Sequence, residues 1–219
     1  MLTFLEKAFP GRIILLDQRG HGFSSWASSY KRRDYGQDLD ALIHKEQIQN
    51  PHFYGHSLGG INALFQVLRQ PSSSLVMEDI GTCITGSNAF IMDLPQCYSS
   101  FREAQAQWNQ QGISLDPFFA ESLSYEKNHW EFRFHREGMV LSQEELNGEY
   151  WAEWKQIHVP TLLLRGENSN VTTAQNHLEM CEGQPHVQYQ EFPEAGHTIH
   201  STHENEVLNV LKSFWKELF

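Results

Sequence analysis

The stretch PHFYGHSLGGINALFQVLRQP, residues 51–71, determines the fold and the chemistry that the sequence predicts. Residues 51–57 are typical of a strand that runs into a turn, and residues 58–69 form an apolar helical pattern that ends before Pro71. Between them, residues 55–59 read G-H-S-L-G, the G-x-S-x-G pattern that exposes a serine on a strained strand-to-helix turn. Glycines are needed there because a Cβ atom would strike neighbouring backbone. The pattern predicts Ser57 as a nucleophile.

On both sides of this motif, short apolar runs alternate with amphipathic helical patterns. Alternating strands and helices predict an α/β fold with a parallel sheet that is covered on both faces. The predicted strands are 11–17, 51–57, 74–81, 159–167 and 187–197, and the predicted helices are 34–49, 58–69 and 203–218.

Residues 86–156 interrupt this alternation and contain no convincing core strand. They hold Trp108, Trp130, Trp151 and Trp154, four of the six tryptophans of the chain. We interpret this segment as a helical lid inserted into a core formed by residues 1–85 and 157–219. It is either a packing module or a lid whose aromatic side chains line a substrate pocket, and the second reading is favoured by insertion at the carboxyl ends of strands.

The composition limits the classes of protein to which the chain can belong. Its 219 residues are 40% hydrophobic and carry a formal charge of −11, which fits a globular chain and argues against a nucleic-acid-binding protein. The longest apolar runs are far shorter than the roughly 20 residues of a membrane span, and the N-terminus lacks a signal-peptide layout. The 3 cysteines have no metal or disulfide spacing, which predicts a cytoplasmic protein. We also expect a monomer or homodimer that acts on a small molecule.

Four segments resemble the α/β-hydrolase superfamily, specifically its serine esterases and lipases with a helical lid. They are LLDQRGHGFS (15–24), GHSLGG (55–60), VPTLLLRGE (159–167) and FPEAGHTIH (192–200). The resemblance covers about residues 4–85 and 157–218. It implies a three-layer α/β sandwich with a mostly parallel sheet and a helical cap, and a reaction that needs no cofactor.

The order of residues along the chain predicts the partners of Ser57. In this superfamily the nucleophile is followed by an acid and then by a histidine, which makes His197 the expected general base. The N–H of Leu58, at the start of the helix, is the expected oxyanion donor, and His56 is expected to shape the substrate pocket. Three histidines in HTIHSTH (197–203) also suggest a metal cluster, but their spacing does not bring all three to one helix face, and we expect no metal site.

The acid of the triad departs from the family pattern. The usual aspartate follows the next-to-last strand, where this chain has Gly166-Glu167-Asn168-Ser169-Asn170. Some members place the acid after the strand that follows the nucleophile helix, and Asp79 lies nearest to that position here. Asp79 is therefore the predicted acid, while Glu78, Glu167, the region of Asn170, or no acid at all remain alternatives.

The N-terminal end also departs from the family. LTFLEKAF (2–9) resembles the helix that follows the family's H-G segment, whose N–H completes the oxyanion hole, so we expect a fragment of a longer enzyme or a shortened, impaired member. The predicted activity is hydrolysis of a small, largely apolar carboxylic ester through an acyl-enzyme. A carbon–carbon lyase or hydrolase that uses Arg102, Arg133 or Arg136 in the lid is one alternative, and an impaired ligand-binding or sensor protein is another.

Overall fold

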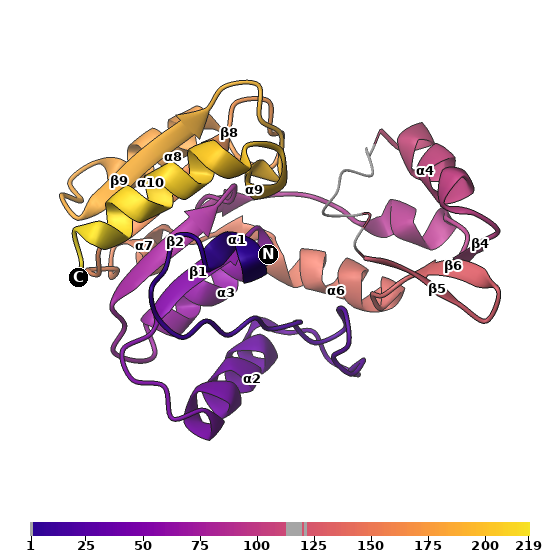
Figure 1. Ribbon diagram of the computed structural model, residues 1–219, viewed down its shortest axis with the longest axis horizontal. Coiled ribbons are helices and arrows are strands. Elements are labelled where there is room, and N and C mark those ends of the chain that lie inside the picture. Colours follow the sequence, from indigo (N-terminus) through magenta and orange to yellow (C-terminus); the bar gives the residue numbers. More distant parts are fainter. Residues whose placement is uncertain (1, 113–119, 121) are drawn as a thin grey trace. The chain divides into compact units, whose positions relative to one another are not determined.

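The computed structural model describes residues 2–112, 120 and 122–219 (Figure 1). It divides into two compact units. We call Met1–Leu16, Gly36–Ile84 and Gly148–Phe219 the sheet unit, and Asp17–Tyr35 with Thr85–Asn147 the insertion unit. Residues 113–119 and 121, which belong to the predicted insertion 86–156, lie outside the described residues.

The sheet unit contains a four-stranded parallel sheet, as the sequence predicts. Its strands are β1 (His52–His56), β2 (Ser74–Glu78), β8 (Thr161–Gly166) and β9 (Val187–Phe192), in the order β1-β2-β8-β9. In this register His56 pairs with Glu78, Glu78 with Leu164, and Gly166 with Phe192. The strands therefore end together, and the loops that follow them meet at one edge of the sheet.

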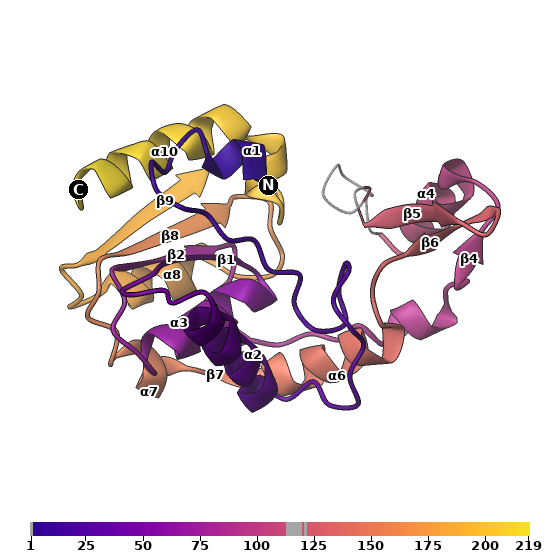
Figure 2. The same cartoon turned by 60° about the horizontal axis from the view of Figure 1, so that its bottom comes forward.

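Helices cover both faces of this sheet and complete the three-layer α/β fold (Figure 2). α1 (Leu2–Leu5) and α10 (Glu204–Lys216) lie on one face, and α3 (Leu58–Val67) and α8 (Ala174–Cys181) lie on the other. The remaining helices are α7 (Trp151–Trp154), α9 (Ile199–Thr202) and α2 (Arg32–Lys45), which begins in the insertion unit and ends in the sheet unit.

Alternate side chains of the strands form the core beneath α10. Val76, Leu162 and Leu164 are at most 1% exposed and pack with Leu211 and Phe214 of α10. Burial of each such side chain contributes about 1.5–3 kcal/mol. The ends of β2 and β8 are therefore fixed in position by the core, which matters because the candidate site is built on the residues that follow them.

The buried strand predicted for residues 11–17 is wrong. The segment forms no strand in the described structure, and Leu15 and Leu16 are 47% and 39% exposed. A continuous apolar run becomes a strand only when a neighbouring strand supplies its hydrogen bonds. Among the described strands, β1 pairs with β2 alone, so the run has no regular secondary structure and Ile13 packs against the core.

The insertion, which the sequence predicts to be helical, contains strands as well as helices. The insertion unit contains η1 (Ala89–Asp93), α4 (Phe101–Gln110) and α6 (Arg136–Leu146), but also an antiparallel sheet of β4 (Cys97–Tyr98), β6 (His129–Phe132) and β5 (Leu123–Glu126). Lys127 and Asn128 both have positive φ, 50° and 66°, as a two-residue hairpin turn requires. The short strands were missed because aromatic side chains at this spacing also fit a helix. In the sheet unit, β3 (Cys83–Ile84) pairs with β7 (Gly148–Glu149), next to the two ends of the insertion.

Candidate active site

The turn between β1 and α3 has the strained geometry that the G-x-S-x-G pattern predicts. Ser57 has φ 53° and ψ −122°, a backbone conformation that residues other than glycine rarely adopt and that costs about 1–3 kcal/mol. A Cβ atom on Gly55 would lie 2.3 Å from the carbonyl carbon and oxygen of Gly59. The Ser57 N–H donates to the Glu78 carbonyl oxygen at 2.9 Å, which ties the turn to the end of β2.

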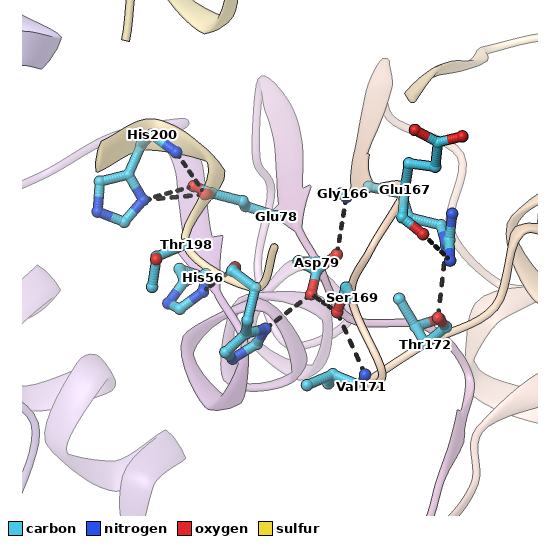
Figure 3. Close-up of polar contacts among 12 residues, drawn as sticks. His56, Glu78, Asp79, Gly166, Glu167, Ser169, Val171, Thr172, Thr198 and His200 are labelled. Atoms are coloured by element: carbon cyan, nitrogen blue, oxygen red, sulfur yellow. Dashed lines mark hydrogen bonds and ion pairs between the residues drawn. The ribbon is translucent and has the colours of Figure 1, made fainter. Parts of the chain in front are cut away.

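Asp79 follows β2 directly and contacts the predicted base. Its side chain is fully buried, and its Oδ2 lies 2.7 Å from Nδ1 of His197, so that this ring nitrogen donates to the carboxylate. The Gly166 N–H donates to Oδ1 at 3.0 Å, and the Ser169 hydroxyl donates to Oδ2 (Figure 3). Asp79 has a positive φ of 51°. A carboxylate with two further donors can hold one tautomer and one orientation of an imidazole.

His56 holds the backbone of the loop that carries His197. Its Nε2 lies 2.8 Å from the His197 carbonyl oxygen, to which it donates as the Nε2–H tautomer, and the two ring centroids are 4.4 Å apart. Burial, followed by the neighbouring His197 charge, lowers the pKa of His56 to about 4, so its ring is neutral near pH 7. Sequence reasoning expected His56 to shape the pocket; the observed contact is with the main chain of His197.

The other carboxylates considered as the acid have different partners. Glu78 contacts Nδ1 of His200 at 2.9 Å. Glu167 accepts from the N–H of Glu194 at 2.9 Å, and Asn170 is exposed. Of the candidate acids, Asp79 is therefore the one that contacts His197 in the described structure.

Ser169 is a residue that sequence reasoning considered only as a lost acid. Its hydroxyl donates to Asp79 and its Oγ also accepts from the Val171 N–H at 3.2 Å (Figure 3). The family position for the usual aspartate thus carries a hydrogen-bond donor toward Asp79, the candidate acid. No sequence signal indicates this contact, because the two residues lie 90 positions apart.

The three histidines of residues 197–203, where the sequence predicts no metal site, have three different partners. His197, His200 and His203 contact Asp79, Glu78 and Thr202 respectively. Among the described residues one group could hold a metal ion: Cys97, His129 and Glu131, whose ligand atoms lie within 4.8 Å of one another. These residues are exposed or half-exposed in the insertion unit, and exposed groups of this kind are common without an ion.

The tryptophans predicted to line a pocket divide between the two units. Trp108 is 3% exposed and lines a cavity of about 430 Å³ in the insertion unit, together with Trp26, Tyr98 and Phe134. Trp154 belongs instead to the sheet unit, where it is 2% exposed and donates to the Met180 carbonyl oxygen at 2.9 Å. Trp154 is therefore a core residue rather than a pocket residue.

A family model described as the alpha/beta hydrolase family matches residues 2–210. The chain belongs to the alpha/beta hydrolase family. It is 26% identical over 219 residues to the sn-1-specific diacylglycerol lipase ABHD11 of Mus musculus, covering 93% of this chain and 71% of the lipase. It is 24% identical over 215 residues to the pimeloyl-[acyl-carrier protein] methyl ester esterase of Legionella pneumophila, covering 94% and 84%. Family membership and these relatives agree on an ester hydrolase as the general class of this alpha/beta hydrolase.

Solved structures support the same fold. The crystal structure of E-2-(acetamidomethylene)succinate hydrolase superposes with a TM-score of 0.80 at 20% identity, covering 91% of this chain and 79% of that one. A marine microorganism esterase superposes with a TM-score of 0.71 at 18% identity, covering 90% and 82%. Among the described residues, this alpha/beta hydrolase has no helix of the length and apolarity that a membrane crossing requires.

Proposed function

We propose that this alpha/beta hydrolase cleaves small, largely apolar carboxylic esters through a covalent acyl-enzyme, with Ser57 as nucleophile, His197 as base and Asp79 as acid. The observation that carries the proposal is the 2.7 Å contact between the buried Asp79 carboxylate and Nδ1 of His197. With its Nδ1–H held by Asp79, His197 presents Nε2 as the basic nitrogen. A serine hydroxyl is a weak nucleophile until such a nitrogen accepts its proton.

The reaction follows from these roles in two halves. Oγ of Ser57 forms a bond to the ester carbonyl carbon while its proton moves to Nε2 of His197. The bond to the alkoxy oxygen then breaks, and the alcohol leaves with that proton. Water attacks the resulting acyl-enzyme, again losing a proton to His197, and the carboxylic acid and free Ser57 are regenerated.

The N–H of Leu58 is the proposed oxyanion donor. Leu58 is the first residue of α3, so its N–H belongs to the helix N-terminus, where backbone donors lack intrahelical partners. A donor at this position stabilises the negative charge that develops on the carbonyl oxygen in the transition state. His56, which is neutral and holds the His197 carbonyl, is proposed to support the loop rather than to act on the substrate.

The arginines that favoured a carbon–carbon lyase have other partners. Arg136 donates to the carbonyl oxygens of Ile91 and Leu94, and the Arg133 guanidinium lies 4.4 Å from the centre of the Phe23 ring. Both residues nevertheless line the cavity of the insertion unit, so the carbon–carbon lyase or hydrolase stays the alternative. The ester hydrolases among the relatives favour the ester hydrolase.

A fluorophosphonate probe tests the nucleophile directly. We expect one adduct, on Ser57, and none on a Ser57→Ala variant. Ser73→Ala is the matched control, because Ser73 also follows a turn but its hydroxyl donates only to the nearby Asn50 carbonyl oxygen among its recorded contacts. Absence of any adduct on folded wild-type protein would refute the proposal and favour a ligand-binding protein. Hydrolysis of p-nitrophenyl esters of increasing acyl length then defines the substrate class.

A further inference from the structure

A second carboxylate–histidine pair lies beside the Asp79–His197 pair. Glu78, the residue before Asp79, is fully buried. Its Oε1 and Oε2 lie 2.9 Å and 3.0 Å from Nδ1 of His200, and the backbone N–H of His200 donates to Oε1 at 2.9 Å (Figure 3). The Tyr54 hydroxyl donates to Oε2. A side chain at the end of β2 thus has donors from β1 and from α9.

The charge on Glu78 is retained despite complete burial. Burial alone would raise the pKa of Glu78, but the hydrogen bond from His200, the charges of His56 and His200, and the Tyr54 hydroxyl outweigh it and lower the pKa to about 2. Burial also raises the pKa of Tyr54 well above its ordinary value, so Tyr54 remains a hydroxyl donor. A buried carboxylate persists in the charged form only where donors surround it in this way.

The two pairs connect the same two segments of the chain. Glu78 and Asp79 are consecutive at the end of β2, and His197 and His200 lie in one turn, with His200 in the first turn of α9. α9 is short, and the recorded cap residue Thr198 makes no side-chain capping bond. The Glu78 carboxylate accepts the N–H of His200 and so satisfies one of the backbone donors that a helix start leaves unpaired.

Asp79 constrains the His197 ring, whereas Glu78 constrains the backbone from which that ring projects. His56 already holds the carbonyl oxygen of His197 itself. The backbone bond from His200 and the two contacts of its ring add a second anchor three residues later, and all three end on a buried carboxylate next to Asp79.

We propose that Glu78 and His200 form a positioning pair that holds residues 197–200, so that His197 keeps its position relative to Ser57 and Asp79. This inference rests on the proposed function. It makes Glu78 a positioning residue that acts through His200, with no contact to substrate.

The first test replaces Glu78 by glutamine. The amide has nearly the same shape but presents an NH₂ group where one carboxylate oxygen accepted, so His200 or Tyr54 loses its acceptor. We expect kcat for p-nitrophenyl butyrate to fall about 10- to 100-fold with KM little changed, because displacement of a catalytic group by about 1 Å has effects of this size. Glu46→Gln is the matched control, since Glu46 forms an exposed ion pair with Arg12.

The second test separates positioning from bulk packing at His200. In His200→Asn, the side-chain NH₂ takes the place of Nδ1–H and can still donate to Glu78, whereas His200→Leu fills the space without a donor. We expect His200→Asn to keep most of the wild-type kcat and His200→Leu to lose as much as Glu78→Gln. The double variant Glu78→Gln/His200→Leu should be no slower than Glu78→Gln alone, because the contact with the His200 ring is lost in both single variants.

The outcomes distinguish this inference from the proposed function. If the wild-type protein forms no fluorophosphonate adduct, the proposed function fails. If the wild type is labelled and the folded variants are labelled equally fast, with a lowered melting temperature only, Glu78 has a purely structural role and the inference is overturned. Should the variants not fold, amide hydrogen exchange on the wild type still decides it: exchange at His200 as fast as in an open loop contradicts the pair, and strong protection supports it.

Discussion

Replacement of Asp79 by asparagine is the sharpest test of the candidate acid. Three donors reach the carboxylate: the Gly166 N–H at Oδ1, and Nδ1–H of His197 and the Ser169 hydroxyl at Oδ2. An asparagine must keep its carbonyl oxygen toward Gly166, because the backbone N–H cannot turn away. Its NH₂ group then faces Nδ1–H of His197 and the Ser169 hydroxyl, which both donate to Oδ2 of Asp79 in the wild type.

This geometry gives the size of the expected effect. Facing a donor, His197 changes tautomer so that Nδ1 accepts and the proton moves to Nε2, the nitrogen that must receive the proton of Ser57. The same change in a serine protease triad lowers kcat by about 10⁴, which corresponds to about 5 kcal/mol of lost transition-state stabilisation. We expect a loss of that order here, with KM little affected.

The assay is steady-state hydrolysis of p-nitrophenyl butyrate, together with the rate of fluorophosphonate labelling. Asp40→Asn serves as control, because Asp40 forms a half-exposed ion pair with Arg69 in the same unit. Circular dichroism and a melting curve establish that both variants fold. A folded Asp79→Asn protein with wild-type kcat/KM would refute the assignment, and the acid would then have to be sought elsewhere or dispensed with.

Three further predictions follow from the same contacts. Ser169→Ala should lower kcat by up to about tenfold, since a hydrogen bond to a charged group is worth about 1.5–3 kcal/mol and part of it orients Asp79; an unchanged kcat contradicts this. The pKa of His56 is about 4 when folded against an ordinary 6.5, so the unfolded chain binds more protons between these values and the free energy of unfolding should fall as pH drops from 6.5 to 4. Urea titrations should show a shallower fall in His56→Gln, and an identical fall would exclude His56 as a source. Gly55→Ala should lose about 1–3 kcal/mol of stability, because its Cβ would lie 2.3 Å from Gly59 backbone atoms; an unchanged melting temperature would contradict that clash.

Local patterns account for the parts of the fold that were predicted from the sequence. The strand, turn and helix around Ser57 lie at β1 and α3 because apolar periodicity and the glycines act within a few residues of one another. The run at 11–17 has the same apolar signal as β1, yet it forms no strand. Its state depends on a partner strand, which is a property of tertiary pairing that periodicity does not contain.

In the candidate site too, local patterns predicted some features and the tertiary structure determined the others. Ser57 and His197 were identified from motif and chain order, and Asp79 from the end of a predicted strand. Sequence spacing gives no indication that Ser169 donates to Asp79 or that Glu78 takes His200 as its partner, because these contacts join residues 90 and 122 positions apart. The sequence names the acidic doublet, but only the tertiary structure brings Asp79 to His197 and Glu78 to His200.

The positive φ angles of Ser57 and Asp79, 53° and 51°, place a limit on how this enzyme can evolve. Ser57 occupies a conformation in which glycine would be relaxed, so the proposed nucleophile is also a site where mutation can release strain. At Asp79 the three hydrogen bonds to the buried carboxylate oppose such a replacement. Selection for heat tolerance alone would favour glycine at position 57 and would remove the chemistry while preserving the fold, so stabilised lineages of this chain have to be screened for turnover at every round.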